Sequence, residues 1–305
     1  MSANGEAGES NFRFAWGDES GRVFVASLFY ARSDDDEEWR AHEIAHIENA
    51  AVYAITLAPH RPDPEVVWIA AGQLWSASLK SGARRAVAGV GGQNFGLCVF
   101  DDWAYWSRSD GAGAHIGRTH LDTGVTEILR QLEQGVPIGL NRDQDGPRIA
   151  WVEQRGTDDH RIFACAPGDL GRSDLREIAT VRAGFGVGVF DQPGRKVTRC
   201  FISSLPSEEA PEGIVCVELD GKTLPRLVGS TKRLVSTHTF GLSSSGGRLF
   251  AKLYWFQGAR GEPKTLWAMS IKREVAAQQR VVWRHDPSSL VEFGEIWSHS
   301  FCALP

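Results

Sequence analysis

One segment of the chain has the spacing of a metal site, His42-Glu43-Ile44-Ala45-His46. On a helix, two histidines four residues apart share a face and can bind one zinc ion at about 2 Å, with the glutamate as a general base. In a strand, the two histidines would lie on one face about 13 Å apart, at roughly 3.3 Å per residue, and the glutamate would point to the opposite face. The chemistry of this segment therefore depends on its secondary structure.

A Phe-Gly step with polar neighbours recurs, as Phe95-Gly96, Phe185-Gly186, Phe240-Gly241 and Phe293-Gly294. Either glycine lets neighbouring backbones approach and phenylalanine packs between them, or the rings line a largely apolar ligand pocket with a few polar groups. His238 and Glu292 are the candidate catalytic residues, because histidine titrates near neutrality and a carboxylate can exchange its proton. The predicted ligand-binding residues are Asn49, Asn94, Phe95, Phe185, Thr239, Phe240 and Phe293.

An internal repeat predicts the elements that position these residues. One apolar run recurs six times, beginning near residues 22, 73, 115, 161, 213 and 265. Another apolar run precedes each copy, a third follows most copies, as at 126–132 and 175–181, and a fourth completes most units, as at 240–245. Four strands repeated every 40–50 residues or so are typical of propeller blades. The sequence therefore predicts an all-β fold, a six-bladed β-propeller with four-stranded blades.

The two ends of the chain are expected to share one blade. The repeat begins at the second strand of a blade, and residues 295–304 can supply the missing innermost strand. Sharing a blade between the N- and C-terminal strands removes open sheet edges. Residues 1–305 then form a single propeller domain, in which residues 1–10 are expected to be flexible.

The same repeat assigns the histidine segment to a strand. Residues 41–55 align without a gap with residues 175–189, and both match residues 84–99 with one extra residue. This alignment places residues 42–46 in the outermost strand of a blade, where the spacing does not suit zinc.

Residues 102–129 carry a resemblance to a known family. Tyr105-Trp106-Ser107-Arg108 stands where the YWTD repeat of low-density-lipoprotein-receptor type propellers has Tyr-Trp-Thr-Asp. The resemblance implies a six-bladed propeller, a fold that hosts many unrelated activities. Six-bladed propellers also include calcium-dependent lactonases, whose metal-binding step resembles Asn-Gly. This chain has Phe-Gly or Ile138-Gly139 there, so neither a metal nor a cofactor is expected.

Two functions stay open at this stage. The first is binding of a small, largely apolar organic molecule in the axial pocket, as in a metal-free biosynthetic enzyme of cyclase or lyase type; whether the protein is an enzyme at all is left open. The second is a protein-interaction scaffold that uses the loop-rich face, where two long loops, 205–213 and 256–264, are expected.

Composition narrows the partners. A net charge of -5 without a Lys/Arg block argues against nucleic acid and acidic membrane surfaces. No apolar run reaches the roughly 18 residues of a membrane span, and the N-terminus has no basic stretch followed by an apolar core. Five widely spaced cysteines are expected to be buried free thiols. The sequence thus predicts a cytoplasmic monomer.

Overall fold

The structure is a computed structural model. It describes residues 9–30, 37–58, 60–111, 113–132, 136–142, 148–156, 159–181, 184–191, 198–204, 213–219, 226–230, 252–257, 265–272, 275–284 and 301–304. These residues are mostly strand, with one 3-10 turn, η1 (Pro167–Asp169). Within these ranges, no helix is long and apolar enough to cross a lipid bilayer.

The described strands pair into six antiparallel sheets, numbered here as blades 1 to 6. Blade 1 has the order β23 (Phe301–Leu304), β1 (Glu9–Gly17), β2 (Arg22–Tyr30) and β3 (Glu37–His46), and blade 2 has β4 (Val52–Ala58), β5 (Glu65–Ala70), β6 (Gln73–Ser78) and β7 (Arg84–Gly89). Blade 3 has β8 (Gln93–Phe100), β9 (Trp103–Asp110), β10 (Gly113–His120) and β11 (Thr126–Leu132), and blade 4 has β12 (Val136–Arg142), β13 (Ile149–Gln154), β14 (His160–Cys165) and β15 (Ala179–Val181). Blade 5 has β16 (Gly184–Asp191), β17 (Thr198–Ser204), β18 (Gly213–Glu218) and β19 (Arg226–Ser230), and blade 6 has β20 (Lys252–Gln257), β21 (Thr265–Lys272) and β22 (Val275–Arg284).

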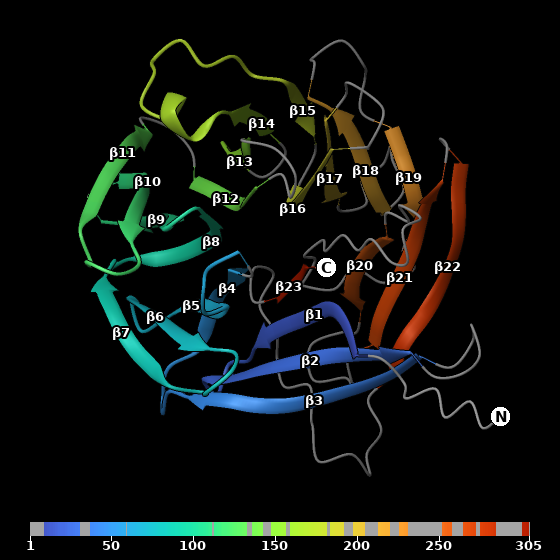
Figure 1. The fold of residues 1–305 in the computed structure, drawn as a ribbon. Coiled ribbons are helices and arrows are strands. Elements are labelled where there is room, and N and C mark those ends of the chain that lie inside the picture. The colour runs from blue at the N-terminus through green and yellow to red at the C-terminus, as the bar shows by residue number, and fades with distance from the viewer. Residues whose placement is uncertain are drawn as a thin grey trace, which may run out of the picture.

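The sheets are arranged around a common centre, with one edge strand of each blade turned inward (Figure 1). Neighbouring inner strands contact one another in the order β23, β4, β8, β12 and β16. The inner strand predicted for blade 6 falls at residues 240–245, outside the described residues. The fold class, all-β with four-stranded antiparallel sheets, is confirmed, while six blades for the whole chain stays a prediction.

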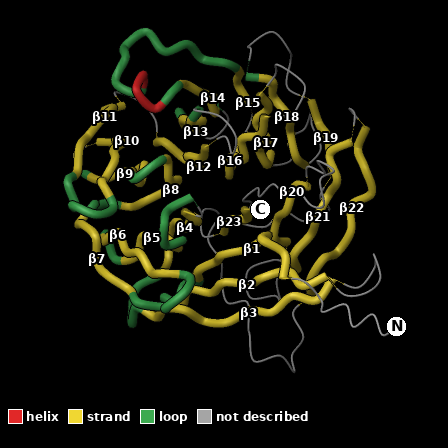
Figure 2. The backbone as a smooth tube through the Cα atoms, in the orientation of Figure 1, coloured by secondary structure: helices red, strands yellow, loops and turns green. Residues whose placement is uncertain are grey.

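The prediction that the two ends share a blade is confirmed. β23 pairs antiparallel with β1, from Arg13 opposite Leu304 to Trp16 opposite Phe301. Figure 2 shows this C-terminal strand at the centre of the ring, beside strands from the start of the chain. β1 begins at Glu9, so the last two residues of the segment 1–10, which was expected to be flexible, belong to this strand.

Buried tryptophans explain why the second strands of blades 1 to 4 occupy the core. Trp16, Trp68, Trp106 and Trp151 lie at matching places in β1, β5, β9 and β13, and all are 0% exposed. Their cross-strand partners on the third strands are Phe24, Trp75, Gly117 and Phe163. The three aromatic partners stack on the tryptophans with interplanar angles of 12° to 15°. In blade 3 glycine takes this place, because a Cβ on Gly117 would lie 2.5 Å from the Trp106 ring. Burial of these large rings supplies much of each blade's apolar contact.

The histidine segment lies in β3, the outer strand of blade 1, as predicted. The predicted arrangement of its side chains is wrong, because a bulge interrupts the alternation at Ile44. His42 pairs with Val25 and His46 pairs with Arg22, so the two histidines lie on opposite faces of the sheet. The ring of His46 instead makes a 3.1 Å hydrogen bond to the carbonyl of Ser20. This geometry removes the basis for a shared zinc ion.

The segment before β15 also differs from the repeat. A strand was expected over 175–181, but only Ala179–Val181 pair with β14. Pro167 has no N–H to donate to a ladder, and it begins η1 within the connection from β14 to β15. This connection carries Gly171, Arg172 and Ser173 past blade 3, where they line a pocket.

Candidate functional site

Three of the sequence-predicted ligand-binding residues have described side chains, Asn49 in the turn before β4 and Asn94 and Phe95 in β8. Asn49 is exposed and adopts a left-handed conformation, with φ of 58°, in the turn before β4. Asn94 is 2% exposed, and its Nδ2 donates a 3.3 Å hydrogen bond to the carbonyl of Gly91. Phe95 is half-buried and packs against a core cluster that includes Ala150 and Val152 of blade 4.

The packing explanation of the Phe-Gly step is confirmed at Phe95-Gly96. A Cβ on Gly96 would overlap the backbone and side chain of Leu140 in β12. Glycine is therefore required where β8 and β12 approach at the boundary between blades 3 and 4, while Phe95 packs into the core.

The remaining axial candidates stay predictions. The backbone of Phe185 lies in β16, but its side chain is not among those described. The other positions, His238, Thr239, Phe240, Glu292 and Phe293, lie outside the described residues.

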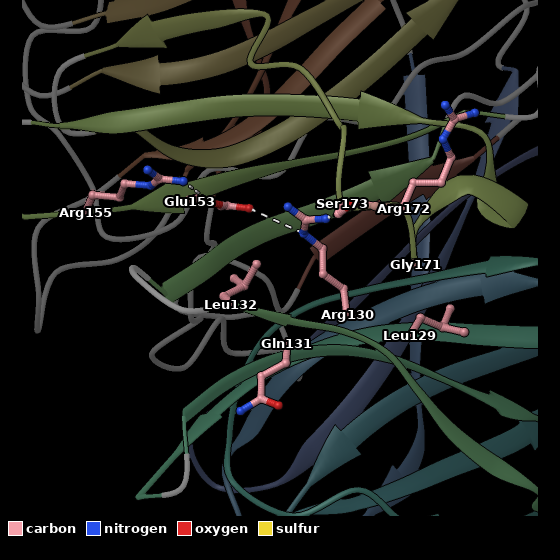
Figure 3. Close-up of a pocket in the computed structure, with 9 residues that line it drawn as sticks. All are labelled: Leu129, Arg130, Gln131, Leu132, Glu153, Arg155, Gly171, Arg172 and Ser173. Carbon is pink, nitrogen blue, oxygen red and sulfur yellow. Dashed lines mark hydrogen bonds and ion pairs between the residues drawn. The ribbon is translucent and has the colours of Figure 1, made fainter.

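A pocket of about 520 Å³ lies between blades 3 and 4 (Figure 3). Polar side chains dominate its wall. Its lining residues are Leu129, Arg130, Gln131, Leu132, Glu153, Arg155, Gly171, Arg172 and Ser173. They come from the end of β11, from β13 and the turn after it, and from the connection that precedes β15.

Strand register places the two charged walls of this pocket opposite each other. In β11, Arg130 pairs with Ile116, and the register shift beside this pair makes Leu129 an extra residue. Ile116 and Leu129 pack in the core shared with blade 4. Because cross-strand partners lie on the same face of a sheet, Arg130 faces blade 4 as Ile116 does. In β13, Trp151 and Glu153 are two residues apart and share a face.

Glu153 is the buried centre of the site. Its side chain is 1% exposed, although it is charged. Trp151 Nε1–H donates a 3.1 Å hydrogen bond to Oε1, and Arg155 donates a 3.1 Å hydrogen bond to Oε2. Arg130 Nε lies 3.9 Å from Oε1. A carboxylate with two cations and an indole N–H beside it is compensated for the loss of water.

The two arginines are less completely paired than Glu153. Arg130 donates a 2.9 Å hydrogen bond from Nη1 to the carbonyl of Arg172, and its guanidinium lies 6.0 Å from the Trp151 ring centroid. The Nε atoms of Arg130 and Arg155 are buried and lack hydrogen-bond partners among the described residues. Each guanidinium has five N–H donors. Both groups therefore retain capacity to bind an acceptor in the pocket.

The third arginine of the lining is already neutralised. Arg172 makes two hydrogen bonds to Asp174, at 2.9 and 2.7 Å, and its Nη1 lies 3.7 Å from Asp169. The hydrogen bond to Asp174 raises the pKa of Arg172 and lowers the pKa of Asp174. Arg130 and Arg155 thus bring two positive charges against the single negative charge of Glu153, which leaves one positive charge in excess among these three groups, whereas the exposed Arg172, paired with both Asp174 and Asp169, adds no positive charge.

An arginine between blades 2 and 3 provides an internal comparison. Arg61 is 11% exposed and pairs with Asp102 at 2.6 Å, Asp122 at 2.5 Å and Glu65 at 3.3 Å. Three carboxylates therefore surround this guanidinium, and the group acts as a link between blades. The residues that line the pocket between blades 3 and 4 have the opposite balance, with three arginines and one carboxylate.

The lining of the pocket contains few groups that could transfer a proton. Its lining has one hydroxyl, on Ser173, and no histidine or thiol. The only carboxylate of the lining, on Glu153, is occupied by three partners. In the part of the chain that the structure describes, no cluster of three or more His, Cys, Asp or Glu side chains could hold a metal ion.

A second polar group lies where the chain departs from the YWTD pattern. Arg108, at the aspartate position of the motif, donates a hydrogen bond to the carbonyl of Val90 in the crossing from blade 2 to blade 3. Asn94 and His115 pair with Arg108 on either side, so the three residues form a row across β8, β9 and β10. Asp110 lies 3.4 Å from Arg108 and 4.0 Å from His115. This row ties blade 3 to the preceding crossing.

Sequence reasoning missed Arg130, Glu153 and Arg155, although a signal was present. Glu153 follows Trp151 at a two-residue interval, so it occupies a core-facing place in an otherwise apolar strand. A charged residue is rarely buried there without partners. Arg130 occupies the corresponding core-facing place in the outer strand of the neighbouring blade.

Comparisons with known proteins identify the fold. No family model matches the sequence, and no curated protein matches it. Among solved structures, a chain of a nidogen/laminin complex is similar, with a TM-score of 0.67, 12% identity and coverage of 96% of this chain and 98% of that one. TolB from Acinetobacter baumannii has a TM-score of 0.66 at 12% identity, with coverage of 98% and 68%. Hydrazine synthase from Kuenenia stuttgartiensis has a TM-score of 0.54 at 12% identity, with coverage of 88% and 80%. The chain is a β-propeller that resembles the YWTD-type propeller of nidogen and the propeller of TolB.

Proposed function

We propose that this chain is a protein-interaction propeller that binds an acidic segment of a partner protein. In this proposal, an aspartate or glutamate side chain of the partner enters the pocket between blades 3 and 4 and accepts hydrogen bonds from Arg130 and Arg155. The observation that carries the proposal is that Arg130 and Arg155 exceed the buried Glu153 by one positive charge at the wall of the pocket. Arginine is well suited to this role, because its planar donors match a carboxylate.

The character of the lining favours a polar protein segment over an apolar metabolite. Arginine, glutamine and glutamate side chains form much of the wall, whereas small-molecule pockets are lined mainly by apolar and aromatic groups. A volume of about 520 Å³ accommodates one side chain together with flanking backbone. The similar nidogen chain comes from a complex with laminin, which supports a role of this fold in protein assembly.

A peptide array tests the proposal. Short segments matched in length and composition, but differing in Asp/Glu content, are probed with the parent protein and with Arg130→Gln and Arg155→Gln. We expect the parent to prefer acidic segments and each variant to lose at least about fivefold in affinity, because a positioned charge pair is removed. Raising the salt from about 0.05 M to about 0.5 M should weaken the binding, since part of the pocket is open to solvent.

Arg161→Gln is the matched control. Arg161 lies on the same blade and pairs with Asp159 and Glu177, but it does not line the pocket. The Arg161→Gln variant should bind acidic segments as tightly as the parent does. Equal binding of acidic and neutral segments by the parent, or an equal loss in Arg161→Gln, would overturn the proposal.

The axial small-molecule function stays a prediction from the sequence. Of the residues it needs, Asn94 is buried and bonded to Gly91, Phe95 packs against blade 4, and His238 and Glu292 lie outside the described residues.

A further inference from the structure

Glu153 is an unusual component of an anion-binding site, because it places a negative charge inside the pocket. We infer that Glu153 makes this pocket selective for a carboxylate over a phosphate, so that the anchor of the partner is an unmodified Asp or Glu side chain rather than a phosphorylated residue. This inference rests on the proposed function and specifies the chemistry of the partner at the same pocket.

The position of Glu153 is fixed by the fold. It lies in β13, two residues after the fully buried Trp151, whose indole N–H donates to Oε1. Arg155 holds the other oxygen at 3.1 Å, and 1% exposure leaves almost no route by which water could screen the charge. Any anion bound by both arginines must therefore share them with Glu153.

Charge balance then distinguishes the two kinds of ligand. Arg130 and Arg155 together exceed Glu153 by one positive charge, and Arg172, which is exposed and paired with both Asp174 and Asp169, adds no positive charge to this group of three. A carboxylate is a monoanion and brings this group to neutrality. A phosphate near neutral pH carries a charge of about −1.5 to −2 and would leave an unbalanced negative charge beside Glu153. Like charges in a partly desolvated site repel more strongly than in water.

The test compares two capped pentapeptides of alanine, one with a central glutamate and one with a central phosphoserine. Binding to the full chain is followed by NMR titration, with a central-glutamine peptide as the uncharged control. The parent should bind the glutamate peptide at least as tightly as the phosphoserine peptide. In Glu153→Gln the preference should reverse. The affinity for the phosphoserine peptide should rise about tenfold relative to that for the glutamate peptide, because the negative charge of Glu153 no longer repels the phosphate.

A conservative variant and a matched control separate charge from structure. Glutamine keeps a carbonyl oxygen that can accept from Trp151 Nε1–H, so the packing of Glu153→Gln is nearly preserved. Glu177→Gln removes a carboxylate of the same blade that pairs with Arg161 outside the pocket, and it should leave the peptide preference unchanged.

A measurement on the parent alone covers the case in which Glu153→Gln does not fold. Lowering the pH from about 7.5 to about 5.5 protonates phosphoserine, whose second pKa is about 6, while a glutamate peptide with a pKa of about 4.3 stays ionised. The charged lining groups are Glu153, Arg130, Arg155 and Arg172, the last paired with Asp169 and Asp174, and the lining has no histidine. The affinity for the phosphoserine peptide should therefore rise relative to the affinity for the glutamate peptide as the pH falls.

The outcomes are distinct. A parent that prefers phosphoserine, or a preference that changes neither in Glu153→Gln nor with pH, would overturn the inference and leave the proposed function standing. A parent that binds the charged peptides no better than the glutamine peptide would overturn both.

Discussion

Trp151 and Glu153 lie two residues apart on one face of β13, joined by a 3.1 Å hydrogen bond from the indole Nε1–H to Oε1. Trp151 is 0% exposed and belongs to the row of core tryptophans that recurs in blades 1 to 4. The residue that organises the blade therefore also orients the carboxylate at the centre of the pocket. Changes in the pocket and changes in the core are coupled through this pair.

The first prediction measures this hydrogen bond. Trp151→Phe removes an indole ring and its bond to a charged acceptor, which together should lower the free energy of unfolding by about 2–4 kcal/mol. Trp68→Phe is the control, because Trp68 is equally buried and stacked on an aromatic partner, but its Nε1 has no hydrogen-bond partner among the described residues. Denaturant unfolding should show that Trp68→Phe loses less unfolding free energy than Trp151→Phe, with a difference of about 1–2 kcal/mol between the two variants. Equal losses would mean that the bond to Glu153 contributes little.

The second prediction concerns the boundary between blades 3 and 4. Gly96→Ala places a Cβ against the backbone of Leu140, so a neighbouring strand must move, and we expect a loss of about 1–3 kcal/mol or more in unfolding free energy. Gly111→Ala is the control in the same blade, since a Cβ there meets nothing within 4 Å. If the two variants have the same unfolding free energy, then the close approach of β8 and β12 is not a requirement of the fold.

The third prediction tests closure of the ring. Ending the chain after Ser300 removes β23 and its pairing with β1. The loss exposes the edge of blade 1 and should cost several kcal/mol, a large part of a typical stability of about 5–15 kcal/mol. Thermal unfolding of the shortened chain is the measurement. An unchanged melting temperature would argue against closure by the C-terminal strand.

The fourth prediction concerns the reactivity of the Cys165 thiol in β14, which packs against the core between blades 3 and 4. Burial, together with the nearby carboxylate of Asp169, raises the pKa of Cys165 to about 12. Because the thiolate is the reactive form, alkylation of Cys165 in the folded protein should be far slower than that of a free thiol at pH 8 and should accelerate as the pH rises toward 12. Peptide mass spectrometry after timed alkylation gives the rate, and the same reaction in urea provides the unfolded reference. Rapid labelling of Cys165 at pH 8 without denaturant would contradict the burial described here.

Much of the fold could be predicted from local sequence. Five copies of the repeated run occupy the third strand of a four-stranded sheet, the sixth occupies the middle one of the three described strands of blade 6, and the strand over 126–132 has the predicted bounds. Alternation of apolar and polar residues carries this information, because one face of each strand must be buried. Cys98, Cys165 and Cys216 form no disulfide, as expected; Cys98 and Cys216 are buried, and Cys165 is partly buried.

The errors arise where several strands decide together. The bulge at Ile44 places His42 and His46 on opposite faces of the sheet. The pattern of apolar and polar residues in β3 does not predict this bulge. The outer strand of blade 4 is limited to Ala179–Val181, and the connection before it contains Pro167 and η1. The pocket was missed because Arg130 and Glu153 belong to different blades, and only the packing of blade 3 on blade 4 brings them within 3.9 Å.

The most direct test of the central claim is an NMR titration that observes the tryptophan indole N–H signals while the glutamate pentapeptide is added. Since Trp151 Nε1–H donates to Glu153 between the two arginines, its signal reports on an anion that binds there. We predict that the Trp151 signal shifts with the same saturation as the binding curve, that the Trp68 signal does not shift, and that Arg155→Gln abolishes the response. A bound peptide that leaves the Trp151 signal in place, or a shift that persists unchanged in Arg155→Gln, would contradict the assignment of this pocket.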